Sequence, residues 1–541
     1  MEHGLGIVET KYADLPGPLE LEGGGRLASV RIAYETYGSL DQERSNAILI
    51  CHALSGDAHA AGYHEGDTRP GWWDIAIGPG KGFDTDKYFV ICSNVIGGCQ
   101  GSTGPSSQNP ATGQPYGMSF PVITIKDMVN AQKMLLDHLG ITNLLAVAGG
   151  SMGGMQALQW AVSYPEAMRR VVVIASTACS TPQQIAFNAV GRRAITADPS
   201  WMSGDYYGRD APSHGLALAR MVGHITYLSD DSMLYRFGRN LQGKEQVGYD
   251  FSTDFQVESY LYHKGDAFIT RFDPNSYLYM TKAVDYFDLT RDGSLIAGLA
   301  PAKAKFLVIG ITSDWLYPPY QSQDIISALS ANRVKAHYGE IRSNYGHDAF
   351  LLEAGQLNYL LKNFFSQVTS GDIMAVDIAT ITEGTTISQA GKIMICRGLN
   401  HLPVVDHSGI LTGIVTSWDI AKAVACELDD LDSITSRPVL TTCADEPVED
   451  AVTRMEENEI SALPVVDAEG RVIGLMTNEH IGPLLRRSRP APAMNGSNGI
   501  AGPRQHGAAW SARPEGASAP DAIGIIAHEQ DCSHEMDGGL R

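Results

Sequence analysis

A serine, an aspartate and a histidine of this chain have the residue types and the order that nucleophilic acyl chemistry requires. Ser151 stands at the centre of the segment GGSMG, residues 149–153, and Asp314 and His347 follow it along the chain. A serine hydroxyl is a weak nucleophile until a base removes its proton, and a histidine oriented by a carboxylate is suited to that task. The sequence therefore predicts that Ser151 is a nucleophile, that His347 is its base, and that Asp314 orients the imidazole.

The segments around these residues predict how the three side chains are brought together. An apolar run at 144–148 leads into GGSMG, and a helix-like segment at 155–160 follows it. This context is typical of a nucleophile elbow, a tight turn that lifts the serine above the carboxyl ends of a parallel sheet. Asp314 follows an apolar run at 306–310, and His347 lies in a glycine-containing loop before a helix. The order serine, carboxylate, histidine is that of the α/β-hydrolase fold.

Each of the three residues also has a simpler interpretation. Ser151 would be the N-cap of a helix that follows a glycine-rich turn. Asp314 would be a solvated turn carboxylate, and His347 a histidine of a loop or a helix cap. Their combination in one order favours the catalytic hypothesis.

The oxyanion of an acyl-transfer intermediate needs backbone donors close to the nucleophile. One predicted donor is the amide of Met152, directly after the serine. The other is the amide of Leu54 in the loop CHALSG, residues 51–56, which follows the apolar run 47–50. The alternative is that this loop is an ordinary turn between a strand and a helix.

Length and composition exclude several classes of function. With 541 residues, of which 44% are hydrophobic, the chain is long enough for two or more domains. A formal net charge of -21 and the lack of a basic stripe argue against nucleic-acid binding. The eight cysteines show no zinc spacing, so no metal site is expected, and their sparseness indicates a reducing compartment. The lack of a secretory signal and of a membrane-spanning run predicts a soluble, cytoplasmic protein.

The chain divides into three predicted parts, of which residues 1–366 form the first. Short apolar runs alternate there with helix-like segments, which indicates a mostly parallel α/β sheet. Between about 181 and 300 the pattern changes to long amphipathic segments, which predicts a helical lid inserted into the sheet domain. The last part, 487–541, is rich in Arg, Pro, Ala, Gly and Ser and is predicted to be disordered. Strands are predicted at residues 47–50, 88–92, 144–148, 171–175 and 305–310.

The middle part of the chain contains an internal repeat. The recurring segments are LPVVD at 402–406 and 463–467, and GIVT at 413–416 matched by GLMT at 474–477. Both pairs have the same spacing, which indicates a tandem module. Its two copies are predicted at 373–427 and 435–486.

Six motifs of the first part resemble those of the homoserine O-acetyltransferase family within the α/β-hydrolase superfamily. The motifs are AYETYG at 33–38, CHALSG at 51–56, GSTGP at 101–105, GSMGGMQ at 150–156, ARMVGHITY at 219–227 and YGHD at 345–348. The resemblance implies transfer of an acetyl group from the co-substrate acetyl-CoA to the hydroxyl of L-homoserine, in methionine biosynthesis, through an acylated Ser151. It also implies that Arg220 binds the homoserine carboxylate, that Asp348 binds the amino group, and that no cofactor is bound permanently.

Several alternatives stay open at the level of the sequence. Relatives with this framework use succinyl-CoA as donor or serine as acceptor, and an esterase-type hydrolase would need the same catalytic residues. Arg220 would otherwise be a surface arginine that extends its guanidinium into water, and Asp348 would be a helix N-cap. A homodimer is the expected assembly, with neither nucleic acid nor membrane as a partner.

The tandem module resembles a pair of CBS motifs, compact α+β units that commonly bind adenosine nucleotides or S-adenosylmethionine. In the first copy, the resemblance implies Thr416 and Asp419 as ligand contacts. The second copy has His480 in place of the aspartate, so at most one well-formed nucleoside site is expected. The hypothesis is that an adenosyl ligand regulates the enzyme, and the alternative is a structural or dimerising module.

Overall fold

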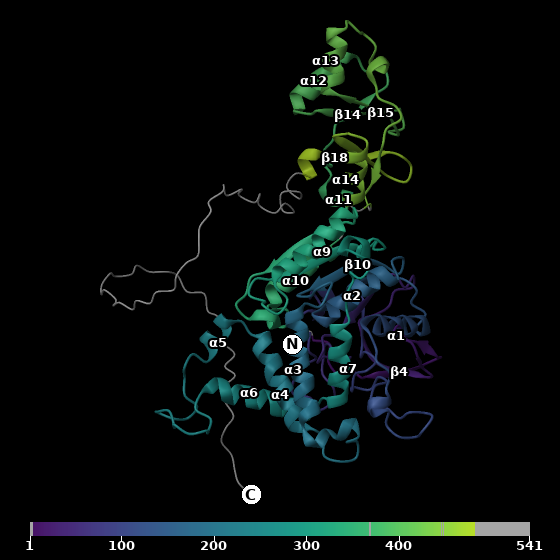
Figure 1. The fold of residues 1–541 in the computed structure, drawn as a ribbon. Coiled ribbons are helices and arrows are strands. Elements are labelled where there is room, and N and C mark those ends of the chain that lie inside the picture. Colours follow the sequence, from purple (N-terminus) through teal and green to yellow (C-terminus); the bar gives the residue numbers. More distant parts are fainter. Residues whose placement is uncertain (1–3, 367–368, 445, 447, 482–541) are drawn as a thin grey trace, which may run out of the picture. The chain divides into compact units, whose positions relative to one another are not determined.

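A central sheet of eight strands positions the predicted site (Figure 1). The computed structural model describes residues 4–366, 369–444, 446 and 448–481. The strands of the sheet are β1 (Lys11–Leu15), β4 (Val30–Tyr37), β5 (Ala47–Cys51), β8 (Phe89–Ser93), β9 (Leu144–Gly150), β10 (Met168–Ile174), β11 (Lys305–Ile311) and β12 (Ala336–Ile341). Their order is β1-β4-β8-β5-β9-β10-β11-β12, and all pairings from β8 to β12 are parallel. The predicted mostly parallel α/β sheet is confirmed.

Apolar side chains cover both faces of this sheet. In β5, Ala47, Leu49 and Cys51 belong to one hydrophobic core, whereas Ile48 and Ile50 belong to a second core on the other face. A parallel strand between two covering layers requires such continuous burial. The first core includes residues of α1 (Ile125–His138), α2 (Met152–Ser163) and α9 (Pro319–Ala331), and the second includes residues of α10 (Ala354–Phe365).

The five predicted strands correspond to β5, β8, β9, β10 and β11, and the structure adds β1, β4 and β12. Polar residues such as Arg31 and Glu35 interrupt β4, so its sequence lacks the continuous apolar run of the central strands. β4 pairs antiparallel with both β1 and β8. Smaller elements are β2 (Leu19–Glu20), β3 (Arg26–Leu27), β6 (Ile77–Gly78), β7 (Phe83–Asp84) and η1 (Gly117–Ser119).

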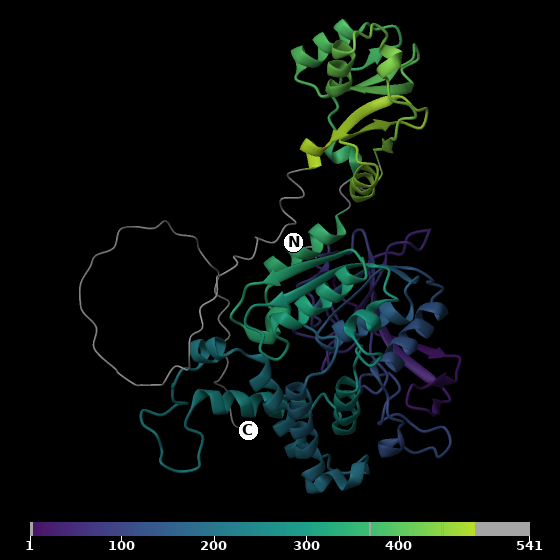
Figure 2. The same cartoon turned by 45° about the horizontal axis from the view of Figure 1, so that its top comes forward.

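The long insertion between β10 and β11 is helical. Its helices are α3 (Pro182–Ala197), η2 (Pro199–Gly204), α4 (Ser213–Tyr227), α5 (Asp230–Arg236), α6 (Gln256–Ile269), α7 (Pro274–Asp285) and α8 (Leu295–Leu299). α4 packs against both α3 and α6, and the teal helices of the insertion gather on one side of the sheet domain in both views (Figures 1 and 2). β10 and β11 still pair directly, with Val173 opposite Val308, so the insertion leaves the sheet unbroken.

Two copies of one α+β unit follow in the sequence. The first consists of β13 (Ile381–Thr382), α12 (Ile387–Arg397), β14 (His401–Val405), β15 (Leu411–Thr416) and α13 (Ser417–Ala425), and the second of β16 (Thr442–Cys443), α14 (Val448–Glu457), β17 (Ala462–Val466) and β18 (Val472–Thr477). Val404 lies opposite Gly413 in the first copy, and Val465 lies opposite Gly474 in the second. The two copies therefore share one register, and each has its own hydrophobic core. Two short helices, α11 (Ser370–Ile373) and η4 (Leu431–Ile434), accompany them.

Part of the predicted organisation lies outside the described residues. This applies to the segment 487–541, for which disorder was predicted, and to residues 482–486 of the second copy. Among the residues that the structure describes, no helix combines the length and the hydropathy that a membrane span needs.

Candidate active site

The turn between β9 and α2 holds Ser151 in a strained backbone conformation. Its φ is 57° and its ψ is -124°, a combination that residues with a side chain seldom adopt and that is found in strained functional turns. Ser151 occupies the N-cap position of α2, but its side chain makes no capping hydrogen bond. The hydroxyl is therefore available for chemistry, and helix capping does not account for the serine.

Close backbone contacts require the glycines around Ser151. A Cβ atom on Gly153 would lie 2.0 Å from the carbonyl oxygen of Cys51, at the end of β5. A Cβ atom on Gly149 would lie 2.4 Å from the carbonyl oxygen of Gly153. Both distances are far shorter than van der Waals contact, so a larger residue at either position would push α2 away from the sheet.

Asp314 and His347 form a buried pair at the ends of neighbouring strands. Asp314 follows β11, and His347 lies in η3 (Gly346–Leu351), which follows β12. His347 Nδ1 donates a hydrogen bond to Asp314 Oδ2 at 2.7 Å, and both side chains are buried. Asp314 Oδ1 accepts hydrogen bonds from the backbone amides of Leu316 and Tyr317. The carboxylate is thereby fixed in the orientation that holds the imidazole.

Two opposing effects set the pKa of His347. Burial disfavours the charged imidazolium, but the neighbouring Asp314 carboxylate outweighs burial, so the pKa of His347 is raised above its ordinary value of 6.5. Asp348 acts in the same direction. The raised pKa favours a histidine that accepts a proton from a hydroxyl and holds it as an imidazolium.

Tyr317 is a residue of this site that was not predicted from the sequence. Its hydroxyl interacts with the Ser151 hydroxyl, and its ring centre lies 5.0 Å from that of His347. Among the described residues, no hydrogen bond joins Ser151 to His347 directly. Tyr317 lies three residues after Asp314 in the loop that follows β11, and this position is the feature of the sequence that could have indicated its place in the site.

Leu54, Ser151 and Met152 line one narrow cavity of about 50 Å³. Tyr227 of α4 and Tyr317 line the same cavity, so the helical insertion borders the nucleophile. Within the described part of the chain, the backbone N–H groups of Leu54 and Met152 donate no hydrogen bond. Both amides are thus available to a ligand, as the predicted oxyanion hole requires.

Buried polar side chains hold the loop that carries Leu54. His52 Nε2 accepts the backbone amide of Val95 at 3.1 Å, and His52 Nδ1 donates to the carbonyl of Ala53 at 2.7 Å. Gln156 of α2 donates to the carbonyl of His52. Burial lowers the pKa of His52, so this histidine is a neutral structural group. His52 and Gln156 lie in the motifs at 51–56 and 150–156, and no role was predicted for either residue.

Aromatic side chains of the insertion enclose Arg220. Its guanidinium carbon lies 4.6 Å from the ring centre of Phe268 and 5.6 Å from that of Tyr227. Its Nη1 donates to Ser55 Oγ at 3.3 Å. Because Ser55 directly follows Leu54, the guanidinium stands beside the predicted oxyanion loop. This enclosure does not fit an arginine extended into water.

Asp348 lies inside η3, whose N-cap is Tyr345, so the alternative of a capping aspartate is wrong. Burial raises the pKa of Asp348 above its ordinary value, against the opposing charges of His347, Arg220 and Arg236. No ion pair within 4.0 Å joins Arg220 to Asp348 in the part of the chain that the structure describes. The guanidinium of Arg220 and the carboxylate of Asp348 therefore do not neutralise each other in a direct ion pair. Such an arrangement could bind the carboxylate and the amino group of an amino acid.

Thr416 and Asp419 form a capping box at the start of α13. Thr416 Oγ1 accepts the amide of Asp419 at 3.2 Å, and Asp419 Oδ2 accepts the amide of Thr416 at 2.9 Å. In the second copy, His480 Nδ1 accepts the amide of Thr477 at 3.2 Å. The change from aspartate to histidine therefore preserves the helix cap, and both positions have a structural role besides any contact with a ligand.

The structure also brings Glu35, His59 and His64 together, with donor atoms within 4.8 Å of one another. The sequence predicted no metal site because it shows neither a C-x-x-C pair nor a histidine-rich zinc spacing. The sequence signal of this set is the pair of histidines in a glycine-containing loop, but the carboxylate comes from a separate strand.

The sheet topology, the elbow and the strand-end pair define the chain as a protein of the α/β-hydrolase fold. Residues 46–354 match the alpha/beta hydrolase fold family, and residues 371–426 and 431–481 match the CBS domain. Within this class, the chain belongs to the homoserine O-acetyltransferase family. The expected fold class, family and CBS pair are confirmed.

Full-length relatives and solved structures support this membership. The chain is 62% identical over 488 residues to the homoserine O-acetyltransferase of Methanosphaerula palustris, covering 90% of this chain and 100% of the relative. It is 57% identical over 511 residues to that of Methanosarcina acetivorans, covering 89% and 95%. The structure of homoserine O-acetyltransferase from Bacillus anthracis is similar at 34% identity and a TM-score of 0.63, covering 66% of this chain and 97% of that one. Esterase E22 is similar at 34% identity and a TM-score of 0.61, covering 66% and 100%.

Proposed function

We propose that the protein transfers an acetyl group from acetyl-CoA to the hydroxyl of L-homoserine through an acetylated Ser151. The observation that carries this proposal is the 62% identity to a homoserine O-acetyltransferase over the whole length of that relative. The strained elbow at Ser151 and the buried Asp314–His347 pair support a covalent route.

In the first half-reaction, His347 takes the proton of Ser151 while the serine oxygen attacks the thioester carbonyl carbon. The amides of Leu54 and Met152 stabilise the negative charge on the carbonyl oxygen. The carbon–sulfur bond then breaks, and His347 returns the proton to the sulfur of coenzyme A. Asp314 stabilises the imidazolium that exists between these two proton transfers.

In the second half-reaction, homoserine takes the place of coenzyme A. His347 removes the proton of the homoserine hydroxyl, whose oxygen attacks the acetyl carbonyl, and Ser151 leaves with the proton. Arg220 binds the carboxylate of homoserine with two parallel N–H donors, and Asp348 binds its amino group. The narrow cavity around Ser151 supports transfer to homoserine rather than to water.

Incubation of the full chain with acetyl-CoA in the absence of homoserine tests the covalent route. We expect a burst of coenzyme A release and an increase in the mass of the Ser151 peptide by one acetyl group. Ser151→Ala removes both signals, whereas Ser163→Ala, at the far end of α2, serves as the matched control and keeps them. Sequential kinetics together with an unmodified Ser151 peptide would contradict the route.

Measured rates with different donors and acceptors distinguish the proposed activity from three alternatives: a succinyl donor, a serine acceptor, and hydrolysis of an ester. The esterase alternative has an observation in its favour, because esterase E22 is similar in fold at 34% identity. We expect the rate with acetyl-CoA and homoserine to exceed the rates with succinyl-CoA or with serine, and hydrolysis without an acceptor to be slower still. Faster hydrolysis than transfer would favour an esterase, and a faster rate with succinyl-CoA or serine would reassign the substrate.

A second function, the binding of an adenosyl compound by the CBS pair, is proposed for regulation. A cavity in the second copy is lined by Glu456, Glu459, Ser461 and Asn478 together with apolar side chains. Carboxylates repel phosphate groups, so this cavity favours a ligand without phosphates, such as S-adenosylmethionine. We also propose that Thr416 or Asp419 of the first copy contacts the adenosyl ligand.

Calorimetry of the full chain with S-adenosylmethionine, ATP and AMP tests the regulatory proposal. We expect saturable binding of S-adenosylmethionine and a change in the acetyl-transfer rate, because regulation requires that the ligand alters an affinity or a rate at the other site. Glu459→Gln should weaken binding of the cationic ligand, whereas Asp406→Asn, in a turn of the first copy, is the control. Absence of binding with unchanged rates would leave a structural module.

A role in methionine biosynthesis, a cytoplasmic location and a homodimeric assembly are part of the same proposal. The family membership supports the pathway, since acetylation activates the homoserine hydroxyl for replacement. Sedimentation equilibrium of the full chain tests the dimer, and a monomer at micromolar concentration would contradict it.

A further inference from the structure

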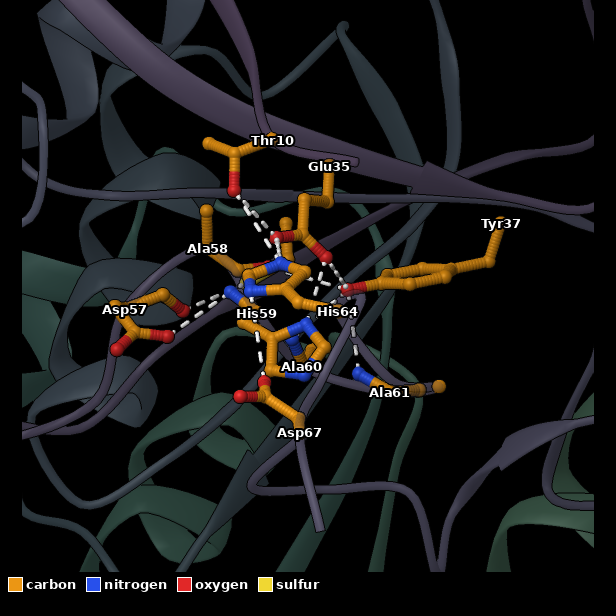
Figure 3. A network of polar contacts seen from close by, with 12 residues as sticks. Thr10, Glu35, Tyr37, Asp57, Ala58, His59, Ala60, Ala61, His64 and Asp67 are labelled. Atoms are coloured by element: carbon orange, nitrogen blue, oxygen red, sulfur yellow. Dashed lines mark hydrogen bonds and ion pairs between the residues drawn. The ribbon is translucent and has the colours of Figure 1, made fainter. Parts of the chain in front are cut away.

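Three potential metal ligands meet beside β4 (Figure 3). Glu35 lies on β4, and His59 and His64 lie in the loop that follows β5. His59 Nδ1 is 3.0 Å from Glu35 Oε2, and His64 Nε2 is 2.8 Å from Glu35 Oε1. One carboxylate oxygen and one ring nitrogen of each histidine lie within 4.8 Å of one another.

Glu35 places a negative charge inside the protein. Its side chain is 0% exposed. Four side chains contact its two carboxylate oxygens: Thr10 and His64 lie against Oε1, and Tyr37 and His59 lie against Oε2. A buried carboxylate that stays ionised needs a compensating positive charge or a full set of donors.

The two imidazole rings lie close together. Their centres are 3.8 Å apart and their planes are tilted by 32°. Each ring turns one nitrogen toward Glu35, so the three side chains bring their donor atoms to one place. A divalent cation held among these atoms would balance the charge of the buried Glu35 carboxylate.

We propose that Glu35, His59 and His64 bind a divalent transition-metal ion. Two histidines and one carboxylate form a donor set that suits zinc and its first-row neighbours. Ligand atoms about 2.1 Å from one ion lie about 3.0 to 3.4 Å apart when the angle between them is square to tetrahedral. The observed distances are 2.8 Å from His64 Nε2 to Oε1 and 3.0 Å from His59 Nδ1 to Oε2, so they reach this range with small outward shifts if Glu35 binds through both oxygens.

The surrounding groups orient the ligands as outer-shell partners of a metal site do. Thr10 Oγ1 and the Tyr37 hydroxyl donate to the two Glu35 oxygens at 2.8 and 2.9 Å. Asp67 Oδ2 lies 3.7 Å from His64 Nδ1, the ring nitrogen that faces away from Glu35. A carboxylate at this position favours the tautomer whose other nitrogen binds metal. The His64 side chain is 36% exposed, which gives an ion access from solvent.

An ion at this position has a structural role, since it ties the loop after β5 to β4. The same loop carries Leu54, and its next segment is already held by the Tyr37 hydroxyl, which accepts the amides of Ala60 and Ala61. The ion would therefore stabilise the segment that positions a predicted oxyanion donor, without contacting the reacting atoms.

Metal binding to the full, untagged chain tests this proposal independently of enzymatic activity. The chain is freed of metal with a chelator and titrated with Zn²⁺ by calorimetry, and with Co²⁺ as an optical probe because Zn²⁺ has no visible absorption. We expect one ion per chain. His59→Ala and His64→Ala should each lower the affinity at least about 100-fold, while His138→Ala, an exposed histidine at the end of α1, should leave it unchanged.

The controls separate this site from other donors and from misfolding. Exposed thiols at Cys396, Cys426 and Cys443 are a competing source of binding. Stoichiometric binding that survives both histidine substitutions would place the ion elsewhere and overturn the proposal. Failure of the wild-type chain to bind either ion would also overturn it, and this outcome does not depend on the folding of any variant. Thr10→Val keeps all three ligands and should weaken binding about 10-fold.

Discussion

Asp314 reaches His347 with one carboxylate oxygen while two backbone amides hold its other oxygen. The distance from His347 Nδ1 to Asp314 Oδ2 is 2.7 Å, and the amides of Leu316 and Tyr317 donate to Oδ1 at 2.9 and 2.8 Å. The imidazole is therefore positioned by a carboxylate that cannot rotate freely. This relationship leads directly to a pH dependence of the proposed reaction.

Asp314→Asn should move the acidic limb of the kcat/KM profile to lower pH. In the wild type, the pKa of His347 is raised above 6.5 because the carboxylate outweighs burial, and activity should fall as the pH drops through this raised value. Without the carboxylate, burial is opposed only by the charge of Asp348, so the pKa of His347 should fall. The rate at the plateau should also fall about 10⁴-fold. Asp324→Asn, at an exposed position of α9, is the control, and an unshifted limb in Asp314→Asn would contradict the assignment.

Arg220→Lys should raise the KM for homoserine about 10- to 100-fold, because a charged two-pronged contact is replaced by a single donor. The KM for acetyl-CoA should change little. Arg239→Lys is a matched control, since Arg239 also stacks on an aromatic ring, at 5.2 Å from Phe255. Equal effects on both KM values would indicate a general disturbance of the insertion instead of a substrate contact.

Asp348→Asn should reduce the preference for acceptors that carry an amino group. The measurement is the ratio of kcat/KM for homoserine to that for 4-hydroxybutanoate, which lacks the amino group. We expect this ratio to fall about 10-fold or more, because a charged hydrogen bond is lost. Arg220→Lys should weaken both acceptors alike, since both keep the carboxylate. A ratio unchanged by Asp348→Asn would remove Asp348 from the amino-group site.

Gly153→Ala should lower the melting temperature of the sheet domain by roughly 5 °C or more. Its Cβ atom would lie 2.0 Å from the carbonyl oxygen of Cys51, so α2 has to move. Gly355→Ala, in the first turn of α10, has open space around the added Cβ atom and should not lower the melting temperature. A melting temperature that Gly153→Ala leaves intact would show that the contact between the elbow and β5 relaxes easily.

Local patterns in the sequence were sufficient to predict the elbow and the central strands. The apolar run of β9, the glycines next to Ser151 and the helical segment after them are neighbours along the chain. Glycines that allow a close approach and apolar runs that favour burial act over a few residues. The polar strand β4 was missed because only its pairing with β1 and β8 makes it part of the sheet.

The remaining features of the site depend on residues that are distant in sequence. The aromatic enclosure of Arg220 needs Phe268 from another helix of the insertion. The cluster of Glu35 with His59 needs a strand and a loop to meet. The sequence by itself determined the chemical groups, their order and the local turns. Only the tertiary structure decided which groups touch, because side-chain distances, burial and the resulting pKa shifts arise from the packing of separate segments.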